Sequence, residues 1–312
     1  MSTRYALLFW CVLLSQCFPS LAIPFASVGN LTIARDTFTG YRDADFKSDP
    51  MSIALAAAPI FLFARDTGHS PCYPESAIKL GSNPPEKNPG TDGNLGPAGI
   101  WTGVDCTDPG PYNGAYTKGR SFPLYVTPKY CSDLNQWRIT YSVYYVHDGA
   151  MSEGHRHDWE DVTVVWTPTE NEDNWQRNSV LLSQHGGRAH LGWGDVETVN
   201  GDEDVRDTSH GNYRAHPKVY VGFFKHPHFA NKDDSFLTED NLPSQRDEEY
   251  RSDDWYYIPT ASDLVPGSVI GDWSAPNNRW NYGGATSSPW NINGGLNKQA
   301  DICGFSGPGD DV

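Results

Sequence analysis

The sequence predicts an all-β protein: a single-domain β-sandwich of antiparallel strands with a few short peripheral helices and long loops. The chain is rich in residues that punctuate or fill such a fold, with 30 glycines, 23 prolines, 16 tyrosines, 13 phenylalanines and 11 tryptophans. Short runs of β-branched and aromatic residues alternate with segments dense in Gly, Asn, Asp and Pro. Five of these runs are expected to form strands, at residues 137–146, 161–166, 179–183, 218–224 and 255–258.

The expected strands differ in the strength of their signal. Residues 137–146 read WRITYSVYYV, residues 161–166 read DVTVVW and residues 218–224 read KVYVGFF, all dominated by β-branched or aromatic side chains. The runs at 179–183 and 255–258 are shorter. Between them, the long loops at 82–114 and 192–216 are the places where a rigid sandwich carries its function.

The first 22 residues have the pattern of a secretory signal peptide. Arg4 supplies positive charge, residues 5–14 form an apolar run, and Ala22 ends a stretch of small residues suited to cleavage. The apolar run is too short to span a bilayer, which requires about 20 apolar residues. We therefore expect a secreted, extracellular chain with this organisation: signal peptide 1–22, poorly structured N-terminal arm 23–50, and domain 51–312.

The cysteines predict two disulfides. Cys11 and Cys17 leave with the signal peptide, and four cysteines remain: Cys72, Cys106, Cys131 and Cys303. An even number in a secreted chain indicates disulfides, and four cysteines allow three connectivities. We favour Cys72–Cys106 and Cys131–Cys303, because the first pair would close a loop with little core of its own. No two of these cysteines have the sequence spacing of zinc ligands.

The net charge of the chain limits the kinds of partner that it can bind. The formal net charge is −16, and loss of Arg4 makes the secreted chain −17. Such a surface repels nucleic-acid phosphates and anionic lipid headgroups, so we expect no nucleic-acid partner. Binding to a membrane would require a bridging cation or a neutral sugar as the contact. We expect a monomer in solution.

The most informative motif is residues 154–160, GHRHDWE, which leads into an expected strand. If that strand begins near Asp158, period-two alternation puts five residues on one face: Asp158, Glu160, Val162, Val164 and Trp166. This is the core face, because three of the five are apolar. Two carboxylates at the edge of a buried surface need a cation, an arginine or bound water to offset their charge. His155 and His157 fall on the expected turn, where a histidine can orient a metal-bound water.

A third carboxylate, Asp148, follows the strand at 137–146, and a hairpin would bring Asp148 and Asp158 side by side at one end of the sheet. A cluster of oxygen ligands suits a hard divalent cation such as Mg²⁺ or Ca²⁺. The alternative is a surface hairpin whose charges pair with Arg156 or Lys225.

Other residues receive less weight. His226 and His228, in the segment KHPHF, are interpreted as ordinary loop histidines. The acidic run 202–204 lacks the spacing of an EF-hand and indicates a solvated loop, with a second weak Ca²⁺ site left open. Trp193, between two glycines, is a candidate ligand-binding residue, because an exposed indole can stack on sugars or enter a membrane interface.

The heptapeptide GHRHDWE resembles the signature of the necrosis- and ethylene-inducing (Nep1-like, or NPP1) family, and the segments around Cys72, Asp148, His185, residues 216–222 and residues 254–256 are also similar to it. The resemblance covers roughly residues 35–303. It implies a secreted β-sandwich toxin of plant-associated microbes, in which an acidic cavity with a divalent cation binds glycosyl inositol phosphorylceramide sphingolipids of plant plasma membranes.

The resemblance also implies roles for single residues. Asp148 and Asp158 correspond to the cation-coordinating acids, His155 and Glu160 to residues that hold the water shell of the cation, and His185 to a further cavity histidine. Residues 139–156 correspond to the segment that plant immune receptors perceive. The sequence also departs from the family. The link between Asp148 and His155 is about one residue shorter, the mature chain is longer, and it has two cysteine pairs where many relatives have one. The loop at 199–211 is expanded and is expected to overhang the cavity.

Three functions remain as hypotheses. The first is a non-enzymatic cytolysin that recognises a sphingolipid headgroup, with no catalytic residue. The second is a metal-dependent hydrolase or lyase with Asp158 or Glu160 as general base, which no established catalytic signature supports. The third is a non-cytolytic sugar-binding or immune-eliciting relative.

Overall fold

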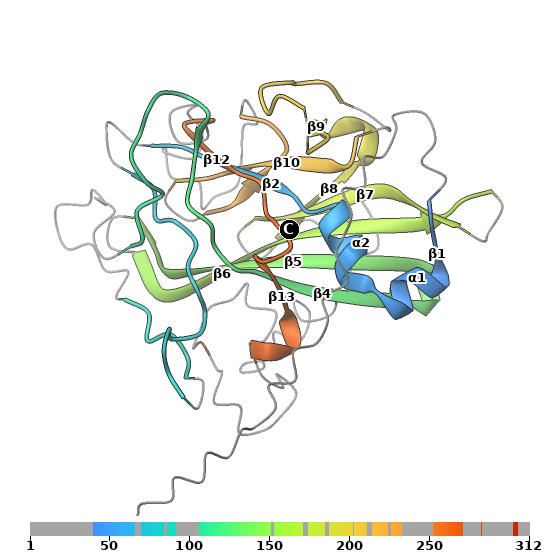
Figure 1. Ribbon diagram of the computed structural model, residues 1–312, viewed down its shortest axis with the longest axis horizontal. Helices are drawn as coiled ribbons and strands as arrows, with labels where there is room; N and C mark the ends of the chain where they lie inside the picture. The colour runs from blue at the N-terminus through green and yellow to red at the C-terminus, as the bar shows by residue number, and fades with distance from the viewer. Residues whose placement is uncertain are drawn as a thin grey trace, which may run out of the picture. The chain divides into compact units, whose positions relative to one another are not determined.

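The computed structural model describes residues 40–65, 70–83, 86–91, 106–150, 153–170, 174–184, 187–201, 203–210, 214–223, 226–232, 252–270, 282 and 302–304, apart from the side chains of 148–150, 153–155 and 187. These residues confirm the all-β prediction. They form two sheets and a few short helices (Figure 1). None of the helices in this part of the chain has the length and apolar character needed to cross a bilayer.

The larger sheet contains the long strands. Its order is β1-β7-β6-β5-β4-β13, with β8 paired to β7. Figure 1 shows β5, β6 and β7 as long green to yellow-green arrows side by side. The bounds are β1 Tyr41–Arg42, β4 Leu124–Cys131, β5 Gln136–Ala150, β6 Glu153–Pro168, β7 Asn174–Gln184, β8 Gly187–Gly192 and β13 Leu264–Pro266.

The smaller sheet has the order β11-β10-β2-β12-β3, with β9 paired to β10. Its strands are β2 Ile60–Phe63, β3 Thr117–Lys118, β9 Thr198–Val199, β10 His216–Val221, β11 His228–Phe229 and β12 Trp255–Tyr257. The long strands pair antiparallel as expected, but β2 with β10, β3 with β12 and β4 with β13 pair parallel. These parallel partners lie far apart in the sequence, which leaves room for the crossover that a parallel pair requires.

The inner faces of the two sheets share one apolar core. Phe61 and Val219 from the smaller sheet belong to the same buried cluster as Tyr141, Val143 and Val162 from the larger one. The expected strands at 137–146, 161–166, 179–183 and 255–258 all lie within or overlap β5, β6, β7 and β12. The strand expected at 218–224 is β10, which begins at His216 and ends at Val221.

The helices are α1 Asp43–Ser48, α2 Pro50–Ala56 and the 3-10 turns η1 Ser132–Leu134, η2 Trp193–Asp195 and η5 Gly267–Ile270. The expectation of a poorly structured arm at 23–50 is wrong from Tyr41 onward. Tyr41 pairs with Trp175 across β1 and β7, and Phe46 of α1 stacks on Trp137 with 5.0 Å between ring centroids. The packed unit begins earlier than expected because this short amphipathic helix buries an aromatic side chain.

Both expected disulfides are present. Cys72 is bonded to Cys106, and Cys131 to Cys303. The second crosslink ties the end of β4 to a residue 172 positions later.

Candidate functional site

The heptapeptide lies in the β5–β6 hairpin, and the predicted face is confirmed. Opposite residues of this antiparallel pair share a face, so Asp158 lies beside Tyr145, Glu160 beside Val143 and Val162 beside Tyr141. This is the inner face, because Tyr141 and Val143 belong to the sandwich core. β6 begins at Glu153 rather than near Asp158, so His155 and His157 are strand residues, and their expected place on a turn is wrong.

Asp158 is buried and bonded to a histidine from the smaller sheet. Its side chain is about 2% exposed, and its Oδ2 lies 2.8 Å from Nδ1 of His226. The ring of His226 is stacked on Tyr145, with centroids 3.8 Å apart and an angle of 4° between the planes. Tyr145 is itself the cross-strand neighbour of Asp158. The carboxylate, the imidazole and the phenol ring therefore form one buried group.

Glu160 forms a second buried group on the same face. Ser183 of β7 donates its hydroxyl hydrogen to Glu160 Oε2. Nδ1 of His228 lies 3.4 Å from the same hydroxyl oxygen and 3.0 Å from the backbone carbonyl oxygen of Asp161. A serine that donates to a carboxylate is not activated by a histidine base, so this geometry does not favour a serine nucleophile.

The interpretation of His226 and His228 as ordinary loop histidines is wrong. His228 opens β11 opposite Val221, which faces the sandwich core, so the ring of His228 also points inward. His226 precedes it by two residues and reaches Asp158 across 68 positions of sequence. The useful signal was the alternation of the two histidines around Pro227 directly after an apolar strand, which is typical of residues on one face.

The Nε2 atoms of His226 and His228 are suited to accept a hydrogen bond. Carbonyl and carboxylate oxygens only accept hydrogen bonds, so Nδ1 of each ring carries a proton, and in the neutral form of the ring Nε2 carries the lone pair. Both Nε2 atoms are buried and have no hydrogen-bond partner among the residues that the structure describes. Buried polar atoms are normally satisfied, and a cation or its bound water would satisfy these two.

The neighbouring carboxylate has a different environment. Asp161, fully buried on the opposite face of β6, is held by the guanidinium of Arg188, whose Nε lies 2.9 Å from Oδ1. Asp158 and Glu160 are bonded to a histidine and a serine instead. Arginine thus neutralises the carboxylate that faces away from the core, while the two on the inner face meet groups that can also bind metal or water.

The side chains of three expected site residues, Asp148, His155 and His185, are not described. The expected hairpin is present, but its register pairs Asp148 of β5 with His155 and pairs Asp158 with Tyr145, so the expectation that Asp148 and Asp158 lie side by side is wrong. Asp148 is three register positions beyond the Tyr145–Asp158 pair.

His157 takes no part in this inner group. Its Nδ1 forms a hydrogen bond of 2.6 Å with the hydroxyl of Tyr144, and its ring lies edge-on to Tyr282. Its φ of 64° lies in the left-handed region, which is strained for a histidine. Strain of this kind persists where the surrounding structure enforces it, and it is frequent at functional sites. Here it falls on the residue directly before Asp158.

The expectation of an exposed Trp193 is wrong. The side chain is about 3% exposed, and the ring packs at 5.7 Å from the guanidinium carbon of Arg177. The flanking glycines do not form an exposed loop tip, because Trp193 opens the 3-10 turn η2, which follows β8 directly. A buried indole is unavailable for stacking on a sugar.

The loop at 199–211 does not overhang the inner face where it is described. Val199 and Val205 pack with Ile60 in a separate small cluster on the outer face of the smaller sheet. Its acids are paired with arginines: Glu203 and Asp207 with Arg214, and Asp204 with Arg206. These ion pairs argue against the second Ca²⁺ site at Glu203 and Asp204.

The buried His228 predicts acid sensitivity. Burial lowers its pKa from the ordinary 6.5 to about 4. Between these values the unfolded chain binds a proton that the folded chain does not, so stability is complete above pH 6.5 and falls as the pH drops towards 4. The slope contributed is at most about 1.4 kcal/mol per pH unit.

His228→Asn keeps a donor for the Asp161 carbonyl but removes this titration. We expect the variant to show a flatter pH dependence of the unfolding free energy between pH 6.5 and 4, measured by urea denaturation. Above pH 7 the slopes of variant and parent should agree. Equal slopes between pH 6.5 and 4 would contradict the assignment.

One family model and several solved structures are similar to this chain. The family model described as necrosis inducing protein (NPP1) matches residues 93–240, a segment that includes the heptapeptide, His226 and His228. The match supports the resemblance of this segment to the necrosis-inducing, Nep1-like family. The search of curated proteins found no match.

Solved structures of this family are similar at low identity. Necrosis and Ethylene inducing Protein 2, from the causal agent of cocoa's Witches Broom disease, is 15% identical, with 59% of this chain and 70% of that chain covered and a TM-score of 0.38. The non-toxic HaNLP3 protein is 17% identical, with 68% and 77% covered and a TM-score of 0.34. NLPPya in complex with mannosamine is 19% identical, with 58% and 67% covered and a TM-score of 0.34.

Proposed function

We propose that this chain is a secreted, non-enzymatic cytolytic effector that binds sphingolipid headgroups of plant plasma membranes through a divalent cation held by acidic residues. The observation that carries the proposal is the pair of buried carboxylates, Asp158 and Glu160, facing two buried histidines inside the sandwich. Asp158 and Asp148 would coordinate the cation, and Glu160 and His155 would hold its water. His226 and His228, and His185 less directly, would complete the cavity.

The donor set supports a hard cation such as Mg²⁺ or Ca²⁺. Buried carboxylates are costly unless a positive charge lies close by. His228 is neutral at pH 7, because burial lowers its pKa to about 4, so it adds no positive charge there. Carboxylate oxygens with open positions for water are the ligands that Mg²⁺ and Ca²⁺ prefer. The cation would supply the positive charge that attracts the ligand.

The partner follows from charge and chemistry. The secreted chain is strongly acidic, at −16 before the signal peptide is removed. A bound cation would give this surface a local positive contact for the phosphate and sugar hydroxyls of a glycosyl inositol phosphorylceramide headgroup. A direct basic patch is not needed. Binding of the chain to the membrane would then cause leakage without cleavage of any bond in the lipid.

Part of the segment that plant immune receptors are expected to perceive is buried in the fold. Residues 139–147 lie in the middle of β5, and every one of them is buried. A receptor cannot read these side chains on the folded chain. We therefore propose that 139–156 is perceived as a peptide after proteolysis, separately from membrane damage.

Vesicle leakage tests the proposal. Dye-loaded vesicles containing glycosyl inositol phosphorylceramide should release dye when the secreted chain and Mg²⁺ or Ca²⁺ are added. EDTA should abolish the release, because it removes the cation but leaves both disulfides intact, and excess cation should restore it. Vesicles without the sphingolipid are the matched control and should stay sealed.

Other outcomes separate the alternatives. Release that persists in EDTA would reject the cation mechanism. Headgroup binding without release would favour the non-cytolytic binding protein instead. Turnover of the glycan or the lipid, followed by mass spectrometry of the vesicles, would favour the metal-dependent hydrolase.

A further inference from the structure

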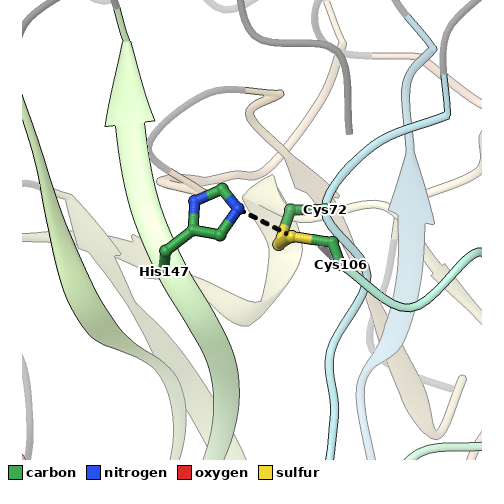
Figure 2. A group of neighbouring side chains, drawn as sticks. All are labelled: Cys72, Cys106 and His147. Atoms are coloured by element: carbon green, nitrogen blue, oxygen red, sulfur yellow. Dashed lines mark hydrogen bonds between the residues drawn. A yellow bond between two sulfur atoms is a disulfide. The ribbon is translucent and has the colours of Figure 1, made fainter. Parts of the chain in front are cut away.

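A second group of ligand-type side chains lies apart from the two carboxylates. Cys72, Cys106 and His147 meet between the connection from β2 to β3 and the strand β5 (Figure 2). Cys72 and His147 are buried, at about 1% and 2% exposure, and Cys106 is half-buried. Nε2 of His147 lies 3.0 Å from Sγ of Cys106. In the structure the two sulfurs are joined as a disulfide.

The contact between the histidine and the disulfide is weak in kind. Disulfide sulfur is a weak hydrogen-bond acceptor, so the 3.0 Å contact between Nε2 of His147 and Sγ of Cys106 is a weak hydrogen bond. Thiolate sulfur and imidazole nitrogen together are the preferred ligands of zinc and of other soft or borderline divalent metals. The arrangement therefore suits the reduced state of this cysteine pair better than the oxidised one.

We propose that reduction of Cys72–Cys106 creates a zinc-type metal site, with Cys72, Cys106 and His147 as three ligands and water as the fourth. One ligand atom from each residue lies within 4.8 Å of the others. Tetrahedral zinc with Zn–S bonds of about 2.3 Å places two sulfurs roughly 3.7 Å apart. The Cα atoms of the two cysteines are 5.1 Å apart, so opening the disulfide needs side-chain rotation and little backbone movement.

The surrounding backbone holds the ligands together without the crosslink. Tyr73 and Thr107, each adjacent to one cysteine, form an isolated β-bridge. The amide of Thr107 donates to the Glu75 carboxylate at 2.9 Å, and the amide of Glu75 donates to the Tyr144 carbonyl at 2.8 Å. Tyr144 lies on β5 three residues before His147, so these bonds connect both cysteine segments to the strand that carries the histidine.

The chemistry balances with a dithiol as reductant. A dithiol gives two electrons and two protons to Cys72–Cys106, which becomes two thiols while the dithiol becomes a cyclic disulfide. Binding of M²⁺ then releases two protons, one from each thiol, and the neutral imidazole adds its lone pair. A disulfide oxidant, which takes up the two electrons and two protons and is itself reduced to two thiols, would re-form Cys72–Cys106 and release the metal. The site is thus redox-gated, and its soft ligands separate it from the hard-cation site at Asp158.

Cobalt(II) titration of the full secreted chain tests the proposal. After reduction with a water-soluble phosphine, Co²⁺ should bind one to one and produce thiolate-to-metal charge-transfer absorption with the visible bands of four-coordinate cobalt. The oxidised chain should show neither signal. His147→Ala should weaken Co²⁺ binding by about 10–100-fold or more, because even partners outside the ligand set contribute that much.

Two variants keep the result interpretable. His190→Ala removes a half-buried histidine that bonds Ser179 on β7, and it should bind Co²⁺ like the parent. The double variant Cys131→Ser/Cys303→Ser should also retain the signal, because the site uses the other pair. Near-ultraviolet circular dichroism of each reduced variant reports folding. An unchanged affinity in a folded His147→Ala variant, or loss of the signal in the double cysteine variant while it remains folded, would overturn the proposal.

Discussion

Asp158→Asn is expected to abolish divalent-cation binding and vesicle leakage while leaving the fold intact. Asparagine has nearly the same shape, and its carbonyl oxygen can still accept from Nδ1 of His226 across the 2.8 Å contact. The lost negative charge is what the cation requires. We expect affinity for Mg²⁺ or Ca²⁺ to fall by at least about 100-fold, since even outer-shell partners of a ligand contribute about 10–100-fold.

The measurement is cation titration by calorimetry together with the leakage assay. Asp133→Asn is the matched control, because it makes the same chemical change at an exposed acid. Asp133 lies in η1, before β5, and therefore outside the β5–β6 hairpin that carries Asp158. That variant should bind and leak like the parent. If Asp158→Asn keeps full cation affinity, Asp158 is not a ligand.

Arg188→Ala is expected to have the largest effect on stability. It leaves Asp161, at 0% exposure, without the guanidinium that contacts both of its oxygens. Removing one partner of a buried ion pair costs about 3–5 kcal/mol, because the remaining charge is buried and uncompensated. The unfolding free energy from urea denaturation at pH 7 should fall by about this amount.

The companion variants show where the cost comes from. Asp161→Asn combined with Arg188→Ala should recover part of the lost stability, because no bare charge remains inside. Arg206→Ala breaks the exposed pair with Asp204 and should leave the unfolding free energy unchanged within error. Equal losses in the single and double variants would mean that packing of the arginine, rather than its charge, holds this part of β6.

Local patterns in the sequence were sufficient to predict much of this structure. Alternation from Asp158 to Trp166 places the two acids on the core face, and the register of β5 with β6 confirms it. Composition alone predicts the β-rich class, because aromatic and β-branched residues fit a pleated, half-buried surface. With the expected signal peptide set aside, four cysteines remain, and the favoured one of their three connectivities is the one present.

The errors concern contacts between segments far apart in the chain. His226 reaches Asp158 only because β10 and β11 bring the smaller sheet against β6. The alternation around Pro227 indicates only a shared face for the two histidines and does not identify Asp158 as the partner. Trp193 is buried because η2 packs on β7, although its flanking glycines indicate a loop. Local propensity does not contain such tertiary information.

Asp148 lies apart from Asp158 along the β5–β6 hairpin. It lies three register positions beyond the pair formed by Tyr145 and Asp158, or about 10 Å along strands that rise about 3.3 Å per residue. A cation shared by both acids therefore requires the end of the hairpin to curl over the inner face. If it does, Asp148 and Asp158 act together.

A crystal of residues 23–312 soaked in Mn²⁺, with anomalous X-ray data, tests the cation site most directly. We predict an anomalous peak within about 2.2 Å of a carboxylate oxygen of Asp158, on the side facing Glu160, His226 and His228. A map with no peak beside Asp158, or with Asp158 bound to a lysine or arginine instead, would contradict the account.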